Sequence, residues 1–580
     1  ESKRDYPASI SPHSPWWSIY RVVNDRNNRI NQLFAETREI RRILVIHPQE
    51  SIWFGRPLEA YGREPAVNRN GFFLHTGVEK KVEMNRAQGI TDELLSRHLD
   101  FDFGDEDQMA RWCRVEPHVL WVGKAAYQAV VIPELRTIRR STLLVLKKFI
   151  QLGGVVFYQG AVPGFVDGLP AGAEEIFRLF RPLQYADLEE FRDISCVLPT
   201  GNEAETILYR LGEGDGRKVL WLCNTSVTSR ADIHAFPAIH ERVISLNKVR
   251  VSWRIPADYQ VYEFDLFTGN STVVNTCREK GITFFFSDFK RLQSRIFIAA
   301  PRVKCPVVPT YLHQAGEFPV VTADGPFRYE LSEENLLVLD HPAWALADGE
   351  WRPETYVLQL DDELHKCLLL PSRSIMARQP WAEQVSDGKY LALRLRYTIR
   401  CKQEFRQVRL GIECPEQWQF SWDGVPFQAV DRGCWCDEAV RTLELPILTP
   451  GRHVLELVTR FSKETVLESI FLIGRFAVNA QYELIALPVK LKKGDWTQQG
   501  FPYYAGNITY HWDFDAEGEM RQFNFADCVG TAFGISLNGE PEHPFVMPPY
   551  EYRFATQRGR NHLAFKVYGS RRNALGPFYC

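Results

Sequence analysis

The sequence has no long apolar segment and no excess of charge of one sign. None of its 580 residues lies in an apolar run close to the roughly 18 residues that a membrane-spanning helix needs. The formal net charge is −3, and basic residues are mixed with acidic ones rather than concentrated as in a nucleic-acid-binding protein. We therefore expect neither a membrane nor a nucleic acid as a partner.

Cysteine is sparse and irregularly spaced. The 12 cysteines lack the dense, regular spacing of a disulfide scaffold, so we expect reduced thiols and favour a cytoplasmic over a secreted protein. Cys434 and Cys436 form a close pair, but a structural zinc site needs four ligands at recognisable spacing, and we predict no metal there. The chain begins with Glu1 rather than Met, which suggests a processed or truncated piece.

Two short apolar runs that stop at a proline stand out in the first 200 residues, at 42–48 and 127–133. Both are rich in β-branched residues, which is typical of parallel strands covered on both faces. A helix-periodic segment follows and ends at Gly153-Gly154, and a further strand is expected at 155–158. This alternation of strand and helix predicts a flavodoxin-like parallel α/β domain over residues 41–200.

After residue 200 the apolar residues repeat every two positions, with turn residues between the runs. Short, evenly spaced strands of this kind predict β-sandwiches. We expect a small sandwich at 201–305, a jelly-roll-like sandwich at 306–482 and a second sandwich at 483–580.

The β-rich region contains a weak internal repeat. The pair Asp423-Gly424 precedes a strand-like segment that begins near residue 453, and Asn538-Gly539 precedes another that begins near residue 562. Asp-Gly and Asn-Gly are the preferred residues of tight hairpin turns. Two jelly-roll units of one type would produce this pattern.

A set of motifs spread over nearly the whole chain carries a family resemblance. They are Arg4-Asp5-Tyr6-Pro7, Pro15-Trp16-Trp17, Val45-Ile46-His47-Pro48-Gln49-Glu50-Ser51, the segment from His98 to Glu106, Gly494-Asp495-Trp496, Pro502-Tyr503-Tyr504-Ala505-Gly506 and Asn573-Ala574-Leu575-Gly576-Pro577. The chain resembles the C-terminal part of the α-L-rhamnosidase-like glycoside hydrolase family 106. It is more loosely similar to glycoside hydrolase families 2 and 42.

This resemblance implies a catalytic (β/α)8 barrel, then a flavodoxin-like domain, then β-sandwiches of the galactose-binding-like type. Residues 1–40 would then be the tail of the barrel, and the catalytic carboxylates would precede Glu1. The expected substrate is an oligosaccharide or a glycoside, with rhamnosides as the first guess. The resemblance therefore places no catalytic residue within this sequence.

One dense group of acids follows a predicted strand, at the edge where α/β sheets bind ligands. It consists of Asp100, Asp102, Asp105, Glu106 and Asp107. Asp102, Asp105 and Glu106 are candidates for contact with substrate. They are also candidates for a divalent cation such as calcium, although no cofactor is otherwise expected. The alternative is that these acids cap and stabilise the start of the next helix.

Four further residues are candidates for substrate binding. His47 and Glu50 follow the first predicted strand, where His47 would contact the substrate or simply bond to a nearby carbonyl. Trp16 and Trp17 lie in a proline-bounded loop and would stack on sugar rings or pack beneath the loop. The segment 48–53 contains no glycine, so the backbone is not suited to close on the phosphate of a flavin or nucleotide.

We interpret the chain as a glycoside hydrolase or its non-catalytic C-terminal portion. The alternative is a carbohydrate-binding or scaffold protein built from the same modules. A glutamine-amidotransferase-like enzyme would need an exposed nucleophilic cysteine, and neither Cys113 nor Cys196 has the sequence surroundings of one.

Overall fold

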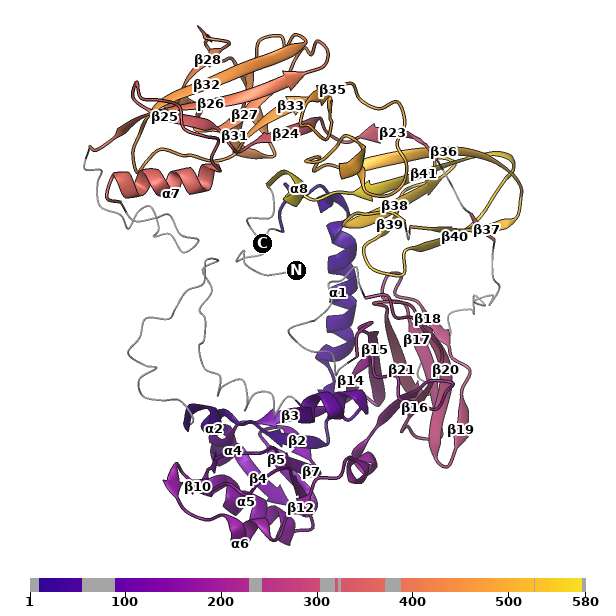
Figure 1. Cartoon of the computed structure of the whole chain (residues 1–580). Helices are drawn as coiled ribbons and strands as arrows, with labels where there is room; N and C mark the ends of the chain where they lie inside the picture. Colours follow the sequence, from indigo (N-terminus) through magenta and orange to yellow (C-terminus); the bar gives the residue numbers. More distant parts are fainter. Residues whose placement is uncertain are drawn as a thin grey trace. The chain divides into compact units, whose positions relative to one another are not determined.

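The computed structural model describes residues 10–54, 89–228, 242–302, 319–321, 325–370, 388–525 and 527–575, which are mostly β-strands (Figure 1). The chain divides into two compact units. One is Asn24–Ala315, with a parallel α/β sheet and a small sandwich; the other is Glu1–Val23 with Gly316–Cys580, with two larger sandwiches. No helix in the described ranges is both long and apolar enough to span a membrane.

The Asn24–Ala315 unit contains a five-stranded sheet whose neighbouring strands are all parallel. In sheet order its strands are β12 (Arg181–Pro182), β9 (Val155–Tyr158), β7 (Ala129–Ile132), β2 (Ile43–Ile46) and β3 (Phe101–Gly104). All four residues of β2 and all four of β7 are buried. The prediction of parallel strands covered on both faces is therefore confirmed.

The two faces of the sheet are covered through alternate residues of the same strands. Leu44 packs in one core with Phe149 of α5 (Arg140–Gln151), whereas Val45 packs in another core with Leu94. Leu94 lies in a helical segment that spans residues 89–96 of the described chain. Because side chains alternate along a strand, each strand contributes to both cores.

Short elements surround this sheet. The helices are α2 (Gln49–Phe54), α4 (Glu106–Trp112), α6 (Glu174–Phe177) and the 3-10 helix η3 (Tyr185–Phe191). One small sheet is antiparallel and contains β4 (Cys113–Glu116), β5 (Val119–Val122) and β6 (Ala125–Tyr127). The other contains β11 (Leu169–Pro170), β10 (Phe165–Val166) and β8 (Thr137–Ile138).

Helix α5 ends at the glycine pair that the sequence indicated. Gly153 has a φ of +83°, and the amide of Gly154 donates to the carbonyl of Phe149 at 2.9 Å. A Cβ atom on Gly154 would lie 2.3 Å from the Phe149 ring. The left-handed conformation and this close approach both favour glycine.

The small sandwich has two sheets. One contains β13 (Ile194–Val197), β16 (Leu246–Trp253), β20 (Ile282–Phe289) and β19 (Cys277–Glu279); the other contains β1 (Arg38–Glu39), β14 (Ile207–Gly214), β15 (Arg217–Asn224), β21 (Ser294–Pro301), β17 (Tyr259–Phe264) and β18 (Ser271–Val273). Helix α1 (Tyr20–Ala35), preceded by η1 (Trp17–Ile19), packs Ile30, Leu33 and Phe34 on Val219 and Ile296. Residues 24–39, which we expected to belong to a barrel remnant, are thus bound to this sandwich because the helix has an apolar stripe that the sheet covers.

Partly buried ion pairs join the parallel sheet to the small sandwich within this unit. Arg42, directly before β2, donates to both carboxylate oxygens of Asp193 at 2.7 and 2.9 Å. The ring of His98 lies 3.0 Å from Glu203, which also accepts a bond from Arg192 at 2.7 Å. Burial by itself would raise the pKa of Glu203, but the bonds from His98 and Arg192 outweigh it and hold that pKa below its ordinary range.

The other unit contains two larger sandwiches. The first has a sheet of β24 (Asn335–Leu339), β33 (Ile470–Gly474), β27 (Arg409–Glu413), β31 (Asp437–Glu444) and β30 (Asp431–Trp435). It faces a sheet of β29 (Val425–Pro426), β28 (Gln419–Trp422), β32 (Gly451–Phe461), β26 (Leu391–Cys401), β35 (Leu484–Ile485) and β34 (Ala477–Val478), with β25 (Ala343–Leu346) also paired to β26. Helix α7 (Val357–Cys367) packs into its core, and the 3-10 helix η7 (Pro415–Gln417) precedes β28.

The last sandwich takes a strand from an earlier part of the chain. Its larger sheet contains β23 (Arg328–Leu331), β36 (Ile508–Glu517), β41 (Arg558–Tyr568), β38 (Ala532–Leu537) and β39 (His543–Phe545). Its smaller sheet contains β22 (Val320–Val321), β37 (Met520–Asn524) and β40 (Glu551–Ala555). The short helices η8 (Trp496–Gln499) and α8 (Arg572–Leu575) belong to the same part of the chain. Because β23 pairs with β36, the boundary that we expected at residue 482 does not separate the two sandwiches. Sequence order alone does not reveal such a long-range pairing.

The weak repeat corresponds to equivalent strands in the two larger sandwiches. One sheet runs β29–β28–β32–β26 with β25 beyond, and the other runs β39–β38–β41–β36 with β23 beyond. Asp423 and Asn538 both have positive φ and are followed by a glycine of positive φ, as a type I′ turn requires. The side chain of Asp423 accepts a bond from the amide of Val454, and that of Asn538 accepts one from the amide of His562, both at 2.8 Å.

Candidate functional site

Two of the predicted site segments lie at one edge of the parallel sheet. His47 follows β2 and Asp105 follows β3, and these strands are neighbours running in the same direction. Their carboxyl ends therefore meet at the same edge. Helix α2 begins there directly after Pro48, and helix α4 begins directly after Asp105.

Arg139 binds the acids at this edge. Its Nε donates to Glu50 at 2.7 Å, and its Nη1 donates to Asp107 at 3.0 Å. Its backbone amide donates to Glu106 at 2.8 Å. Glu106 is only 3% exposed, and burial raises its pKa. One arginine thus ties α2, α4 and the start of α5 together, and the three carboxylates are held in place by it.

The remaining acids of the dense group have separate structural partners. Asp105 caps α4 by accepting a bond from the amide of Gln108 at 2.9 Å, as the capping alternative predicts. Asp102 accepts bonds from Arg41 and from the hydroxyl of Tyr127, both at 2.8 Å. The structure therefore does not gather Asp102, Asp105 and Glu106 around one point.

His47 lies at the same edge beside an exposed aromatic ring. Its ring is perpendicular to that of Phe103, with 5.1 Å between the centroids, and its backbone amide donates to the carbonyl of Gly104 at 2.9 Å. Phe103 is 51% exposed, and Trp53 of α2 is 55% exposed. We did not single out these two rings from the sequence, although Phe103 lies inside the motif from His98 to Glu106 and Trp53 lies in the segment 48–53.

Trp16 and Trp17 belong to the other unit and differ in their surroundings. Trp16 packs against the core formed by Ile19, Ala532 and Tyr568. Trp17 is 40% exposed and stacks on Tyr20, with 5.4 Å between the rings and an angle of 14°. Trp17 therefore presents an open aromatic face, whereas Trp16 has a packing role.

The described residues do not provide a metal centre. They contain no group of three or more His, Cys, Asp or Glu side chains arranged to hold a metal ion. The acids that we considered for calcium, Asp102, Asp105 and Glu106, have arginine or backbone partners instead. The cysteines of the described part are all free.

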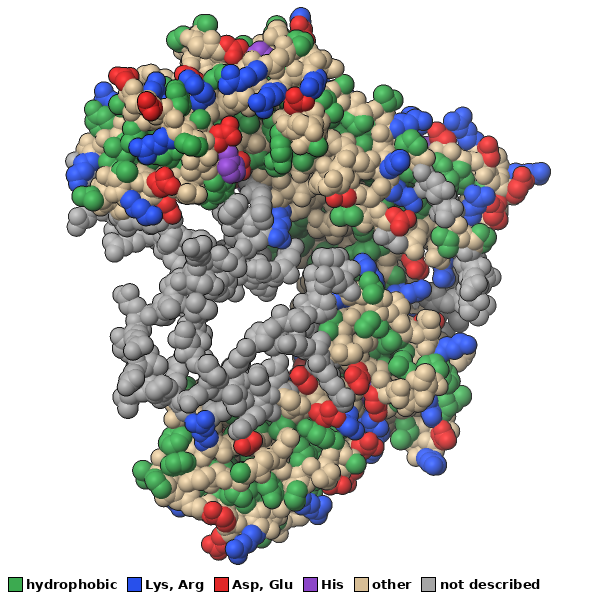
Figure 2. All heavy atoms as spheres, in the orientation of Figure 1, with side chains coloured by type: hydrophobic (Ala, Val, Ile, Leu, Met, Phe, Trp, Pro, Cys, Tyr) green, Lys and Arg blue, Asp and Glu red, His purple; other side chains and the backbone are tan. Residues whose placement is uncertain are grey.

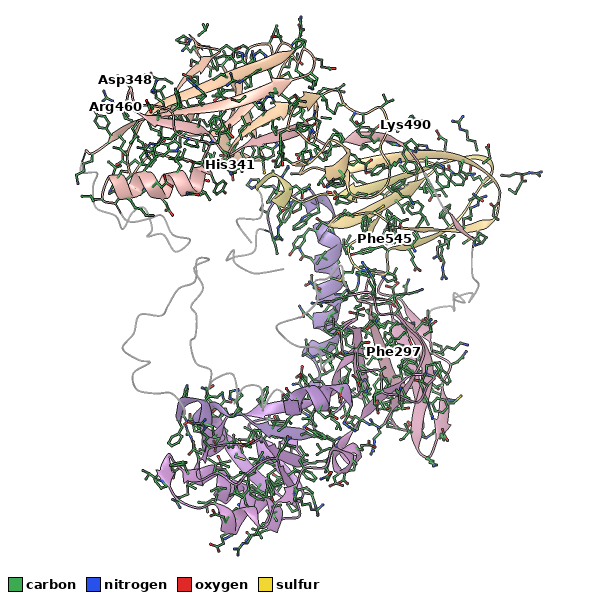
Figure 3. The ribbon with its side chains drawn as sticks, viewed as in Figure 1. Phe297, His341, Asp348, Arg460, Lys490 and Phe545 are labelled. Carbon is green, nitrogen blue, oxygen red and sulfur yellow. The ribbon has the colours of Figure 1, made fainter. Side chains whose placement is uncertain are left out.

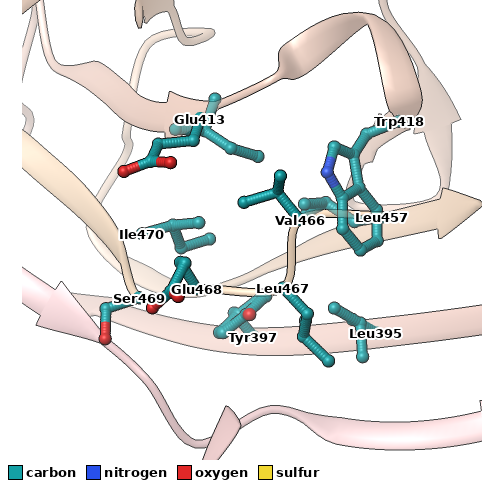
Figure 4. A pocket seen from close by; sticks show the side chains of 11 residues that line it. Leu395, Tyr397, Glu413, Trp418, Leu457, Val466, Leu467, Glu468, Ser469 and Ile470 are labelled. Carbon is teal, nitrogen blue, oxygen red and sulfur yellow. The ribbon is translucent and has the colours of Figure 1, made fainter. Parts of the chain in front are cut away.

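A narrow pocket opens at the edge of the core of the first larger sandwich (Figure 4). Its walls are mostly apolar and include Leu395, Leu457 and Trp418. Glu413 lies at its rim, where burial raises the pKa of the carboxyl group. Glu468 lines the same pocket and would be the second carboxylate needed for acid–base chemistry with Glu413. Glu468 already has an interaction of its own.

No protein-family model and no curated protein matches the chain. Among solved structures, it is similar to a rhamnosidase from Novosphingobium sp. PP1Y (12% identity, TM-score 0.37, covering 78% of this chain and 38% of that one). It is also similar to α-L-fucosidase isoenzyme 2 from Paenibacillus thiaminolyticus (11%, 0.29, covering 49% and 51%) and to a β-galactosidase from Bacillus circulans sp. alkalophilus (10%, 0.26, covering 49% and 44%).

The similar structures named here are glycoside hydrolases, and the chain spans between 38% and 51% of their lengths. At TM-scores below 0.5 the likeness does not establish a shared fold. The function of this chain has to be inferred from its own residues.

Proposed function

We propose that this chain binds carbohydrate as the non-catalytic portion of a glycoside hydrolase, with rhamnosides as the first class of substrate to test. One observation carries the proposal. At the carboxyl edge of the parallel sheet the clustered acids are bound by Arg139, while the rings of Phe103 and Trp53 beside them are exposed. An exposed aromatic ring offers an apolar face on which a sugar ring can stack.

The state of the acids argues against catalysis at this edge. Glycoside hydrolysis requires two carboxyl groups on either side of the scissile bond, one to donate a proton and one to act as nucleophile or base. Glu50 and Asp107 would have to leave Arg139 to do so, and Glu106 is buried. The charge-assisted bonds from Arg139 hold these two carboxylates in place and occupy oxygens that a substrate would need.

We also propose specific fold types for the modules. Numbered along the chain, the parallel strands lie in the order 2-1-3-4-5, which is the flavodoxin-like order. The described segment directly after the first strand is helix α2, which contains no glycine, and this favours a role without flavin or nucleotide. The two larger sandwiches, with their matching strand orders, fit jelly-roll domains of the galactose-binding-like type.

A carbohydrate-binding scaffold protein without any hydrolase activity is the second candidate. It rests on the same exposed rings and differs only in what the whole gene product does. Hydrolysis of aryl α-L-rhamnosides by the full-length gene product, with no turnover by this chain, would support the hydrolase assignment. Robust turnover by this chain alone would contradict the proposal that it is the non-catalytic portion.

Binding is tested by affinity electrophoresis of the chain in gels that contain neutral polysaccharides. We expect Phe103→Ala to reduce retardation by at least one of them. The matched control is Phe286→Ala, which removes an exposed phenyl ring from β20 in the same unit. Equal retardation of the two variants and the parent chain would contradict the proposed role of this edge.

A further inference from the structure

One sheet face of the first larger sandwich carries an arginine-rich surface. The side chains on its outer face alternate with core residues along β26 and β32. We call this surface the arginine face; it consists of Arg394, Arg396, Arg400, Arg452 and Arg460. Figure 2 shows basic side chains gathered over this sandwich. The only acid on the outer face of these two strands is Glu456.

The register brings like charges together at one end of the face. Arg400 lies directly opposite Arg452, and Arg396 lies opposite Glu456. Like charges directly opposite each other on neighbouring strands are unfavourable unless an anion lies between them. Both Arg400 and Arg452 are exposed. This end of the sheet therefore presents a repulsive pair that an anionic ligand would relieve.

The nearby acids already have partners. Glu483 accepts bonds from Asn479 and Lys402, which lower the pKa of its carboxyl group, and the charge of Arg400 lowers it slightly further. Asp423 accepts bonds from the ring of His453 and the amide of Val454. Among the described residues, neither Arg400 nor Arg452 forms an ion pair with a carboxylate, and Arg452 has only a 3.4 Å bond to the hydroxyl of Thr398.

Aromatic rings support the other arginines. The guanidinium of Arg396 lies 3.8 Å from the centre of the Trp351 ring, and that of Arg394 lies 5.0 Å from it. Arg460, labelled at one end of the sandwich in Figure 3, lies 5.0 Å from the ring of Tyr390. Tyr390 is 52% exposed, so a second aromatic face remains open beside the charges.

The equivalent face of the last sandwich has no such excess of positive charge. Asp513 on β36 accepts a bond from Arg328 at 3.0 Å and lies 3.4 Å from Arg560. It also bonds the ring of His562 at 2.8 Å. Lys566 on β41 bonds Glu542 at 3.2 Å. Two sheets of the same strand order thus differ in charge, and the arginine face is not a requirement of the fold.

We propose that the arginine face binds a polysaccharide that carries carboxylates, such as a polyuronate. The inference rests on the proposed carbohydrate-binding function and specifies its ligand. A guanidinium group donates two parallel hydrogen bonds to a planar carboxylate, and Tyr390 offers a ring on which a sugar can stack. A nucleic acid is the less favoured polyanion because the chain has a net charge of −3 and no basic footprint overall.

The test measures the affinity of the whole chain for alginate, for neutral dextran and for oligo(dT). The double variant Arg400→Gln/Arg452→Gln removes the repulsive pair. Its matched control, Arg558→Gln/Arg560→Gln, removes two exposed arginines from the corresponding strand of the last sandwich. We expect the first variant to bind alginate about tenfold more weakly, the control to differ by less than about twofold, and added salt to weaken binding.

Unchanged alginate affinity in Arg400→Gln/Arg452→Gln would overturn the proposal, as would equally tight binding of dextran or oligo(dT). If dextran or another neutral polysaccharide binds through Phe103 and alginate binds no better, only this inference fails. If no polysaccharide of either kind binds, the proposed function fails with it. Far-ultraviolet circular dichroism of both double variants checks that each remains folded.

Discussion

Replacing Arg139 with methionine tests whether the acids at the carboxyl edge are structural. The substitution keeps much of the side-chain volume but removes the bonds to Glu50 at 2.7 Å and to Asp107 at 3.0 Å. The backbone amide that binds Glu106 remains. Arg140→Met is the matched control, because its guanidinium makes only a 3.4 Å contact with Asp167 and both side chains are largely exposed.

The expected loss of stability follows from burial. The side chains of Arg139 and Glu50 are 32% and 20% exposed, so their charge-assisted bond should contribute about 1.5–2.5 kcal/mol. The bond to the more exposed Asp107 should add about 0.5 kcal/mol. Arg139→Met should therefore cost about 2–3 kcal/mol. The same change at Arg140 should cost less than about 0.5 kcal/mol.

Hydrogen exchange is the suitable assay because a chain with several domains does not unfold in one step. We expect amide protection in α2 and α4 to fall about thirtyfold or more in Arg139→Met and to stay nearly unchanged in Arg140→Met. Protection in the two larger sandwiches should not change in either variant. If Arg139→Met leaves α2 and α4 as protected as in the parent chain, the acids are not held by this arginine, and a catalytic role for them has to be reconsidered.

Three further outcomes are expected. Because the pKa of Glu203 is lowered in the folded chain, its ionised carboxylate contributes fully to folding stability at pH values above the ordinary Glu pKa of about 4.3. This contribution is lost as the pH falls through the lower pKa of the folded state. Glu203→Gln should therefore flatten the acid-induced loss of stability in a pH series of thermal melts. Gly154→Ala should destabilise the parallel sheet by about 1–3 kcal/mol because its Cβ meets Phe149, whereas Gly164→Ala, which meets open space, should not, as measured by hydrogen exchange. Asp105→Ala should cost about 1 kcal/mol through the lost cap of α4 while leaving polysaccharide retardation unchanged in affinity gels.

Much of the local structure was accessible from the residue pattern. The apolar runs predicted the buried parallel strands β2 and β7, and Gly153-Gly154 predicted the end of α5. The positive φ values of Asp423 and Asn538 agree with the predicted hairpin turns. These features depend on neighbouring residues and on backbone geometry, so a short segment contains the information that specifies them.

The candidate site was predicted less completely. The sequence placed His47 and the acids from Asp105 to Asp107 at the carboxyl edge of the sheet, because residues after parallel strands meet there; Asp100 instead precedes β3 and Asp102 lies within it. It did not identify Arg139 as the partner of Glu50, which lies 89 positions away. It also did not separate Asp102, which binds Arg41 and Tyr127, from the acids that Arg139 holds.

The sequence by itself determined the strands, the turns and the alternation that places arginines on one face of β26 and β32. Only the tertiary structure decided which charges lie opposite one another, that β23 joins the last sandwich, and which acids are neutralised. Periodicity follows from the repeat of a single strand or helix. Strand register and ion pairing depend on segments that are far apart in the chain and meet only when the core has formed.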